Sequence, residues 1–180
     1  MKKKVLIFII CIIALTGCKN VSNTPTAKVE NFMEKYQSMD SSVLNQLDFV
    51  VSNRNDLTDE QKSDYKTLME KQYQNLSYKI KDEYINGDDA NVIIEVETYD
   101  YRSALNKSEQ YFNNNEKEFR KEDGTINLKK YWDYKIEEMT KVSDRVVNNI
   151  VFTLRKENKK WILNDINDND REKIHGLYRG

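Results

Sequence analysis

Proline, histidine and cysteine are scarce in this sequence of 180 residues, and each scarcity excludes a class of protein. One proline and five glycines are too few for a loop-rich or disordered chain. The single histidine, His175, excludes a histidine-rich metal site. Of the two cysteines, Cys11 lies in an apolar leader, so a chain that loses this leader forms no internal disulfide. The fold must therefore depend on its apolar core, which a domain of about 150 residues can supply.

The charge balance gives no reason to expect a nucleic-acid-binding protein. Charged residues make up 33% of the chain and hydrophobic residues 38%, with a mean hydropathy of −0.82, which excludes a protein with many membrane spans. Removing the three lysines at positions 2–4 from the 29 basic residues leaves 26 against 30 acidic ones, a net charge of −4. Nucleic-acid binding requires a basic face, which this composition does not provide.

Residues 1–17 have the three parts of a secretory leader. Lysines occupy positions 2–4, an unbroken apolar run covers residues 5–15, and small residues follow. As a helix, eleven apolar residues rise about 16 Å, whereas the hydrocarbon core of a bilayer is about 30 Å thick. We therefore predict that this segment is a cleaved signal peptide and not a membrane-spanning helix.

The end of the leader, Leu15-Thr16-Gly17-Cys18, resembles the lipobox of bacterial lipoproteins. The resemblance implies cleavage before Cys18 and a diacylglyceryl thioether on its sulfur, with fatty acyl chains such as palmitate. Two acyl chains would hold the protein at the extracytoplasmic face of a cell membrane. Residues 18–25 then form the lipidated cysteine and a polar tether. The alternative is ordinary signal cleavage that leaves Cys18 as a free thiol.

Apolar periodicity predicts one α+β domain over residues 26–180. Thr58 and Gln61 have the spacing of a capping box that opens a helix, and Asn86-Gly87 separates two alternating runs, as in an antiparallel hairpin. Helices packed on one face of a curved antiparallel sheet satisfy this pattern. The predicted elements are helices over 26–39, 43–51 and 58–76, a hairpin over 78–98, a helical insertion over 104–142 broken at Asp123-Gly124, a hairpin over 146–163, and a short helix capped by Asn167 or Asp168 that ends at Ile174.

The domain also resembles the small NTF2-like lipoproteins in the envelopes of low-GC Gram-positive bacteria. The residues that carry the resemblance are Pro25-Thr26-Ala27, Leu57-Thr58-Asp59-Glu60-Gln61, Lys160-Trp161-Ile162-Leu163 and the segment from Asp170 to Tyr178. The resemblance implies an NTF2-like cone. The helical insertion between the two hairpins is longer than a plain cone carries.

Four polar residues are the candidate ligand-binding set: Asp82, Tyr84, Asp100 and Tyr101. In a cone-shaped sheet, inward polar side chains line a ligand pocket. Asp82 has the same parity as Tyr78 in its strand, so we predict that it points inward. The alternative is that these residues lie at an exposed rim of the sheet.

No metal or cofactor site is predicted. The acidic run from Asn164 to Asp170 places Asp170 and Gly176 where a calcium loop needs glycine and glutamate, so a helix cap explains it better. His175 has the position of a packing or helix-end residue. Eleven tyrosines and two tryptophans suggest a surface that recognises carbohydrate or peptide, although Tyr36, Tyr65 and Tyr73 have core spacing. The residues that are harder to assign to a core are Tyr99, Tyr101, Tyr131 and Tyr134.

The sequence has no phosphate-binding loop, nucleophile elbow or metalloprotease motif. We therefore expect a non-enzymatic domain that binds a protein or a small envelope ligand. Two alternatives remain open: an NTF2-like enzyme with Asp82 or Asp100 as its acid or base, and a purely structural envelope lipoprotein. The sequence leaves the oligomeric state open.

Overall fold

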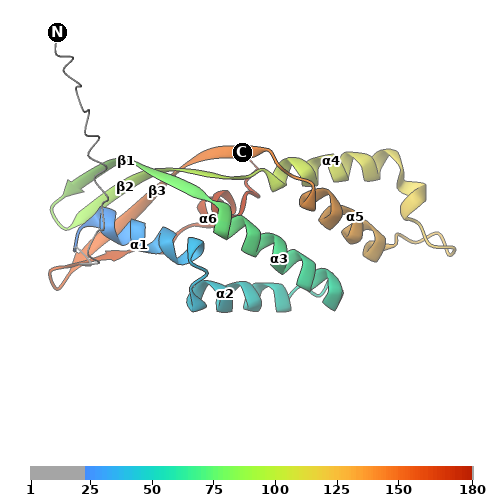
Figure 1. Cartoon of the computed structure of the whole chain (residues 1–180), viewed down its shortest axis with the longest axis horizontal. Coiled ribbons are helices and arrows are strands. Elements are labelled where there is room, and N and C mark those ends of the chain that lie inside the picture. Colours follow the sequence, from blue (N-terminus) through green and yellow to red (C-terminus); the bar gives the residue numbers. More distant parts are fainter. Residues whose placement is uncertain (1–22, 180) are drawn as a thin grey trace, which may run out of the picture.

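The computed structural model describes residues 23–179, and it has the α+β architecture expected from the sequence. Helices gather on one side of an antiparallel sheet, and two further helices form an arm that extends beyond the end of the sheet (Figure 1). The elements in chain order are α1 (Pro25–Gln37), α2 (Ser41–Ser52), α3 (Asp59–Asn75), β1 (Ser77–Asn86), β2 (Asp89–Tyr99), α4 (Tyr101–Asn114), the 3-10 turn η1 (Glu116–Phe119), α5 (Leu128–Thr140), β3 (Arg145–Glu157), β4 (Lys160–Leu163) and α6 (Asp168–His175).

The sheet is antiparallel throughout, with strand order β1-β2-β3-β4. The two hairpins therefore meet through their long strands, and the pairing of Ile94 with Ile150 lies at the centre. The sheet is not closed, since β1 and β4 are its edges in the described part of the chain. Helices on one face of an antiparallel sheet and a helical insertion between two hairpins are both confirmed.

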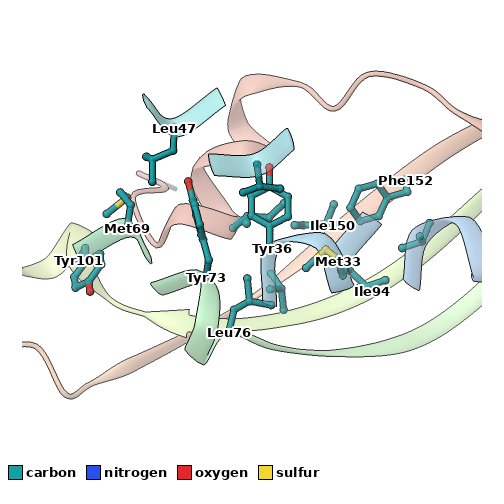
Figure 2. Close-up of a cluster of buried hydrophobic side chains, with 14 of the residues drawn as sticks. Met33, Tyr36, Leu47, Met69, Tyr73, Leu76, Ile94, Tyr101, Ile150 and Phe152 are labelled. Carbon is teal, nitrogen blue, oxygen red and sulfur yellow. The ribbon is translucent and has the colours of Figure 1, made fainter. Parts of the chain in front are cut away.

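The core lies between the inner face of the sheet and the helices. Alternating residues of β2 are buried there, among them Ile94, which lies in one cluster with Ile150 and Phe152 of β3 (Figure 2). Phe32 of α1 places its ring 5.4 Å from that of Phe152. Tyr36 and Tyr73 then meet edge to face at 5.0 Å, joining α1 to α3. Edge-to-face rings add about 1 kcal/mol beyond the burial of their surface. Aromatic packing thus holds the first and third helices against the sheet.

A bulge in β1 corrects the predicted orientation of Asp82. Ile80 pairs with Ile94 and Asp82 with Ile93, so Lys81 is an extra residue with no register partner in β2, although its side chain reaches the carboxylate of Glu95. One extra residue reverses the side-chain alternation that follows it. Asp82 therefore lies on the outer face of the sheet, and the prediction that it points inward is wrong.

Glu83 takes the inward place that the sequence analysis gave to Asp82. Its carboxylate accepts hydrogen bonds from the backbone N–H of Thr26 at 2.9 Å and from the hydroxyl of Thr26 at 2.7 Å. The first turn of a helix has unpaired N–H groups and favours negative charge. The bulge therefore supplies α1 with an acceptor at its N-terminus.

The arm formed by α4, η1 and α5 has a small aromatic core of its own. Phe119 is buried, and its ring lies within 6.2 Å of four other rings. The four surrounding residues are Tyr111, Phe112, Tyr131 and Tyr134. Gln61 of α3 ties the arm to the body, because its side-chain amide donates to the backbone oxygen of Lys129 and to the carboxylate of Asp133.

The chain enters the domain at the end of the sheet opposite the arm (Figure 1). The side chain of Asn23 donates to the backbone oxygen of Lys159 and accepts from the backbone N–H of Trp161, which fixes it beside β4. From this end β2 runs to Asp100, where α4 begins. Within residues 23–179, no helix is long and apolar enough to span a membrane.

Candidate functional site

The four residues of the predicted ligand-binding set are not brought together. Tyr84 donates its hydroxyl to the carboxylate of Asp82 at 2.5 Å on the exposed outer face of β1. Asp100 caps α4 by accepting from the N–H of Ser103, and Tyr101 is fully buried. Since Asp82 is opposite Ile93, seven residues along from there to Asp100 correspond to roughly 20 Å. The two pairs therefore form no common pocket, and their role in binding stays a prediction.

Tyr101 has a structural role in this arrangement. Its hydroxyl donates to the backbone oxygen of Leu68 at 3.2 Å, which joins α4 to α3. Burial raises the pKa of Tyr101 to about 12, so the phenol stays neutral at physiological pH. Cys18, the predicted lipidation site, lies outside the described residues.

A cleft beneath α2 brings together polar groups that the sequence analysis did not combine. The helices α1, α2, α3 and α6 all contribute to it, and its cavity volume is about 60 Å³. The lining residues are Tyr36, Val43, Gln46, Leu47, Val50, Tyr65, Met69, Tyr73, Arg171 and His175. Most of them are apolar or aromatic, and a few polar atoms converge, which is the usual composition of a small-ligand site.

His175 is held neutral at the inner end of this cleft. Its Nε2 and the hydroxyl of Tyr73 form a hydrogen bond at 3.1 Å. Burial of the imidazole, together with the charge of Arg171, lowers the pKa of His175 to about 4. Burial raises the pKa of Tyr73 and of Tyr36 above the usual value for a phenol. These three groups are therefore uncharged at neutral pH.

Arg171 carries the one charge among the residues that line the cleft. It lies four residues before His175 on α6, a spacing that places both side chains on the same helix face. One of its N–H groups donates to the backbone oxygen of Ile166 at 3.4 Å, and Asp168 is 3.8 Å away. The spacing of Arg171 and the lone histidine is the sequence signal that would have indicated this site.

A second polar feature is a row of alternating rings and cations where the arm meets the α2–α3 loop. Arg54 lies 5.6 Å from the ring centre of Tyr65 and 4.8 Å from that of Trp132. Lys135 lies 4.4 Å from Trp132 and 4.1 Å from Tyr131. We call these five half-buried residues the ring–cation ladder. Each such contact contributes about 0.5–2 kcal/mol, depending on how far it is desolvated.

The two cations of the ladder differ in whether a carboxylate neutralises their charge. Arg54 forms two hydrogen bonds of 2.8 Å with the carboxylate of Asp56. Lys135 has no ion pair or hydrogen bond with any residue from 23 to 179; it contacts two aromatic rings, and Glu109 and Asp56 act on its charge only from farther away. Burial lowers the pKa of Lys135, although Glu109 opposes that shift. The ladder is therefore a half-buried aromatic surface with excess positive charge.

The described residues contain no group of three or more histidine, cysteine or carboxylate side chains that could hold a metal ion. The acidic run near the C-terminus supplies a cap, as the sequence analysis favoured: the side chain of Asn167 accepts from the N–H of Asp170. The carboxylate of Asp170 in turn accepts from Lys173 at 2.8 Å.

Comparison with known proteins gives one weak likeness. No protein-family model and no curated protein matches the chain. Among solved structures, the chain is similar to a candidate lipoprotein (ycdA) from Bacillus subtilis, with 18% identity and a TM-score of 0.41. The match covers 85% of this chain and 48% of that protein, so the chain spans about half of its length. At this identity and TM-score, the likeness carries no conclusion about activity.

Proposed function

We propose that this chain is a lipid-anchored extracytoplasmic lipoprotein, attached through Cys18, whose domain binds a partner protein with the ring–cation ladder of its arm. The leader supports the anchor, because its apolar run is too short to span a bilayer and ends at a lipobox-like cysteine. The proposal extends to an NTF2-like relationship, which helices on one face of a curved antiparallel sheet support.

The observation that carries the binding function is the position and composition of the ladder. Tryptophan, tyrosine and arginine are the residue types that contribute most to protein interfaces, especially where they are already partly desolvated. In the ladder, Trp132, Tyr131 and Arg54 are held in place by stacking, so binding would cost little side-chain entropy. The excess charge of Lys135 favours a partner surface with carboxylates.

The proposed anchor and the proposed binding surface lie at opposite ends of the domain. From Cys18 to Asn23 the chain extends at most about 18 Å, so a lipid on Cys18 keeps the entry end of the domain close to the membrane. The arm lies at the other end of the sheet (Figure 1). A partner could therefore approach the arm without displacing the anchor.

The anchor is tested by mass spectrometry and fractionation of the native chain against Cys18→Ala. We expect the native protein in the membrane fraction with a diacylglyceryl mass on residue 18, and the variant as an uncleaved or unlipidated form. Two acyl chains contribute of order 20 kcal/mol to membrane attachment, so partial release of the native protein is not expected. A native protein free in the medium with an unmodified thiol would overturn the proposal.

Binding through the arm is tested by photo-crosslinking in cells. A photoreactive phenylalanine analogue replaces Leu128, which is 57% exposed and lies four residues before Trp132 on α5. In a matched strain it replaces Tyr84, which is 56% exposed on the outer face of the sheet. We expect a discrete adduct from position 128, absent from position 84 and lost in Lys135→Glu. Adducts of equal yield from both positions, or an adduct that survives Lys135→Glu, would contradict binding by the ladder.

A non-enzymatic role is part of this proposal. It is supported by the places of the two candidate acid–base residues: Asp82 lies on an exposed sheet face, and one oxygen of Asp100 accepts the capping hydrogen bond of α4. General acid–base catalysis needs a group positioned against substrate in a protected site. Neither carboxylate lines the cleft beneath α2.

A further inference from the structure

We propose that the cleft beneath α2 is a second binding site, which takes a short-chain carboxylic acid with its alkyl chain among the apolar walls and its carboxylate on Arg171. This site includes no residue of the arm, although Tyr65 both lines the cleft and forms one end of the ladder. The ligand class follows from three properties of the lining: an unused hydroxyl, a single positive charge and a small apolar volume.

The unused hydroxyl belongs to Tyr36. Tyr36 is only 5% exposed, and its hydroxyl forms no hydrogen bond with the residues from 23 to 179. No described side-chain polar atom is both sealed from solvent and without a partner, so this oxygen must reach the open space of the cleft. Figure 2 shows the hydroxyls of Tyr36 and Tyr73 pointing to the same side as Leu47 of α2. A buried tyrosine normally finds a partner, and a ligand oxygen would provide it.

The positive charge of Arg171 is poorly neutralised by the protein itself. Its ion-pair partner Asp168 is 3.8 Å away, and the side chain of that aspartate is 97% exposed, so the pair is screened by water and weak. The guanidinium has five N–H donors, of which one is used on the backbone oxygen of Ile166. Since no carboxylate lines the cleft, the local charge favours an anion over a cation.

The apolar volume limits the ligand to a short chain. Val43, Leu47 and Met69 are buried walls, and Val50 at the rim is 51% exposed. A cavity of about 60 Å³ has room for about four or five water molecules by the same measure. An alkyl chain of about four carbons fills such a space, which makes pentanoate the matched probe.

The proposal is tested with pentanoate, pentan-1-ol and pentylamine, which share a chain and differ in the charge of the head group. Binding to the mature full chain is measured by ligand-observed saturation-transfer NMR. We expect pentanoate to bind in the millimolar range and at least tenfold more tightly than pentylamine. Arg171→Gln should weaken the binding of pentanoate about tenfold, to an affinity no higher than that of pentan-1-ol. Arg155→Gln, on the outer face of the sheet, should leave the affinity for pentanoate unchanged.

A second pair of variants separates the cleft from the rest of the surface. Val50→Trp covers the rim of the cleft, and Val151→Trp makes the same change at a valine of matched exposure, 49%, on the outer face of the sheet. We expect binding of pentanoate to be lost in the first variant and kept in the second, with both showing native unfolding midpoints. The proposal is overturned if the native chain does not bind pentanoate, if Arg171→Gln binds as well as native, or if both tryptophan variants lose binding equally.

Discussion

The half-buried imidazole of His175 predicts an acid-sensitive fold. His175 is the one histidine of the chain, and its pKa of about 4 in the folded state compares with 6.5 for an exposed imidazole. Between pH 6.5 and 4 the unfolded chain binds a proton at this residue and the folded chain does not. The free energy of unfolding therefore falls as the pH falls through this window, and above pH 6.5 the residue has no effect.

The magnitude follows from the difference between the two pKa values. A shift of about 2.5 pH units corresponds to a full loss of about 3 kcal/mol by pH 4, and about 2 kcal/mol of it is reached at pH 5. Native domains are stable by only about 5–15 kcal/mol, so this single residue would shift the unfolding midpoint measurably. Arg171 adds to the effect, because its charge opposes protonation of the imidazole.

The assay compares urea unfolding of the native chain and of His175→Gln at pH 7 and pH 5. Glutamine can still form a hydrogen bond with Tyr73, but it does not titrate. The carboxylates titrate in both proteins, so a difference between the two pH dependences of the unfolding free energy comes from His175. We expect the native chain to lose about 2 kcal/mol more than the variant on this acidification. NMR gives a second reading, since one histidine yields one titrating ring signal. Parallel pH dependences of the two proteins, or a ring that titrates near 6.5 in the folded state, would refute the reasoning.

Three other substitutions test separate parts of the fold. Gly176→Ala should cost about 2–4 kcal/mol in urea unfolding, because a Cβ there would collide with backbone and side-chain atoms at a φ of +70°, whereas Gly87→Ala in open space should cost about 1 kcal/mol. Glu83→Ala removes the acceptor at the start of α1 and should cost about 1 kcal/mol, against no measurable loss for Glu157→Ala at the exposed end of β3. Phe119→Ala should raise amide exchange in the arm and leave the sheet protected; equal exchange in both would contradict an independent arm core.

Local features of the fold were predictable from the sequence because their causes are local. The capping box of Thr58 and Gln61 is confirmed, with the reciprocal hydrogen bonds that define it. The predicted hairpin is confirmed: Asn86 pairs with Asp89, and Gly87, the first of the two turn residues between them, has a φ of +63°, a conformation that glycine adopts without strain. In each case two or three neighbouring residues determine the conformation.

The bulge at Lys81 and the composition of the cleft were not predictable, because their causes are tertiary. Strict alternation through β1 is the simplest interpretation of its sequence, and only pairing with β2 reveals the extra residue. Tyr36 and Tyr73 were assigned to the core by their spacing, which is correct, but the spacing does not indicate that their hydroxyls meet α6 and a cleft. The contact of these rings with residues about a hundred positions later is set by packing.

The extra residue in β1 has a consequence for how this strand tolerates change in length. Deleting a residue within a strand normally turns every following side chain to the opposite face. Here, loss of Lys81 alone would join Ile80 directly to Asp82 while both kept their present partners in β2, Ile94 and Ile93. Loss of Lys79 would instead turn Ile80 out into water and Lys81 into the core. Position 81 of this edge strand is therefore one at which a single-residue deletion keeps the pairing register of β1 with β2.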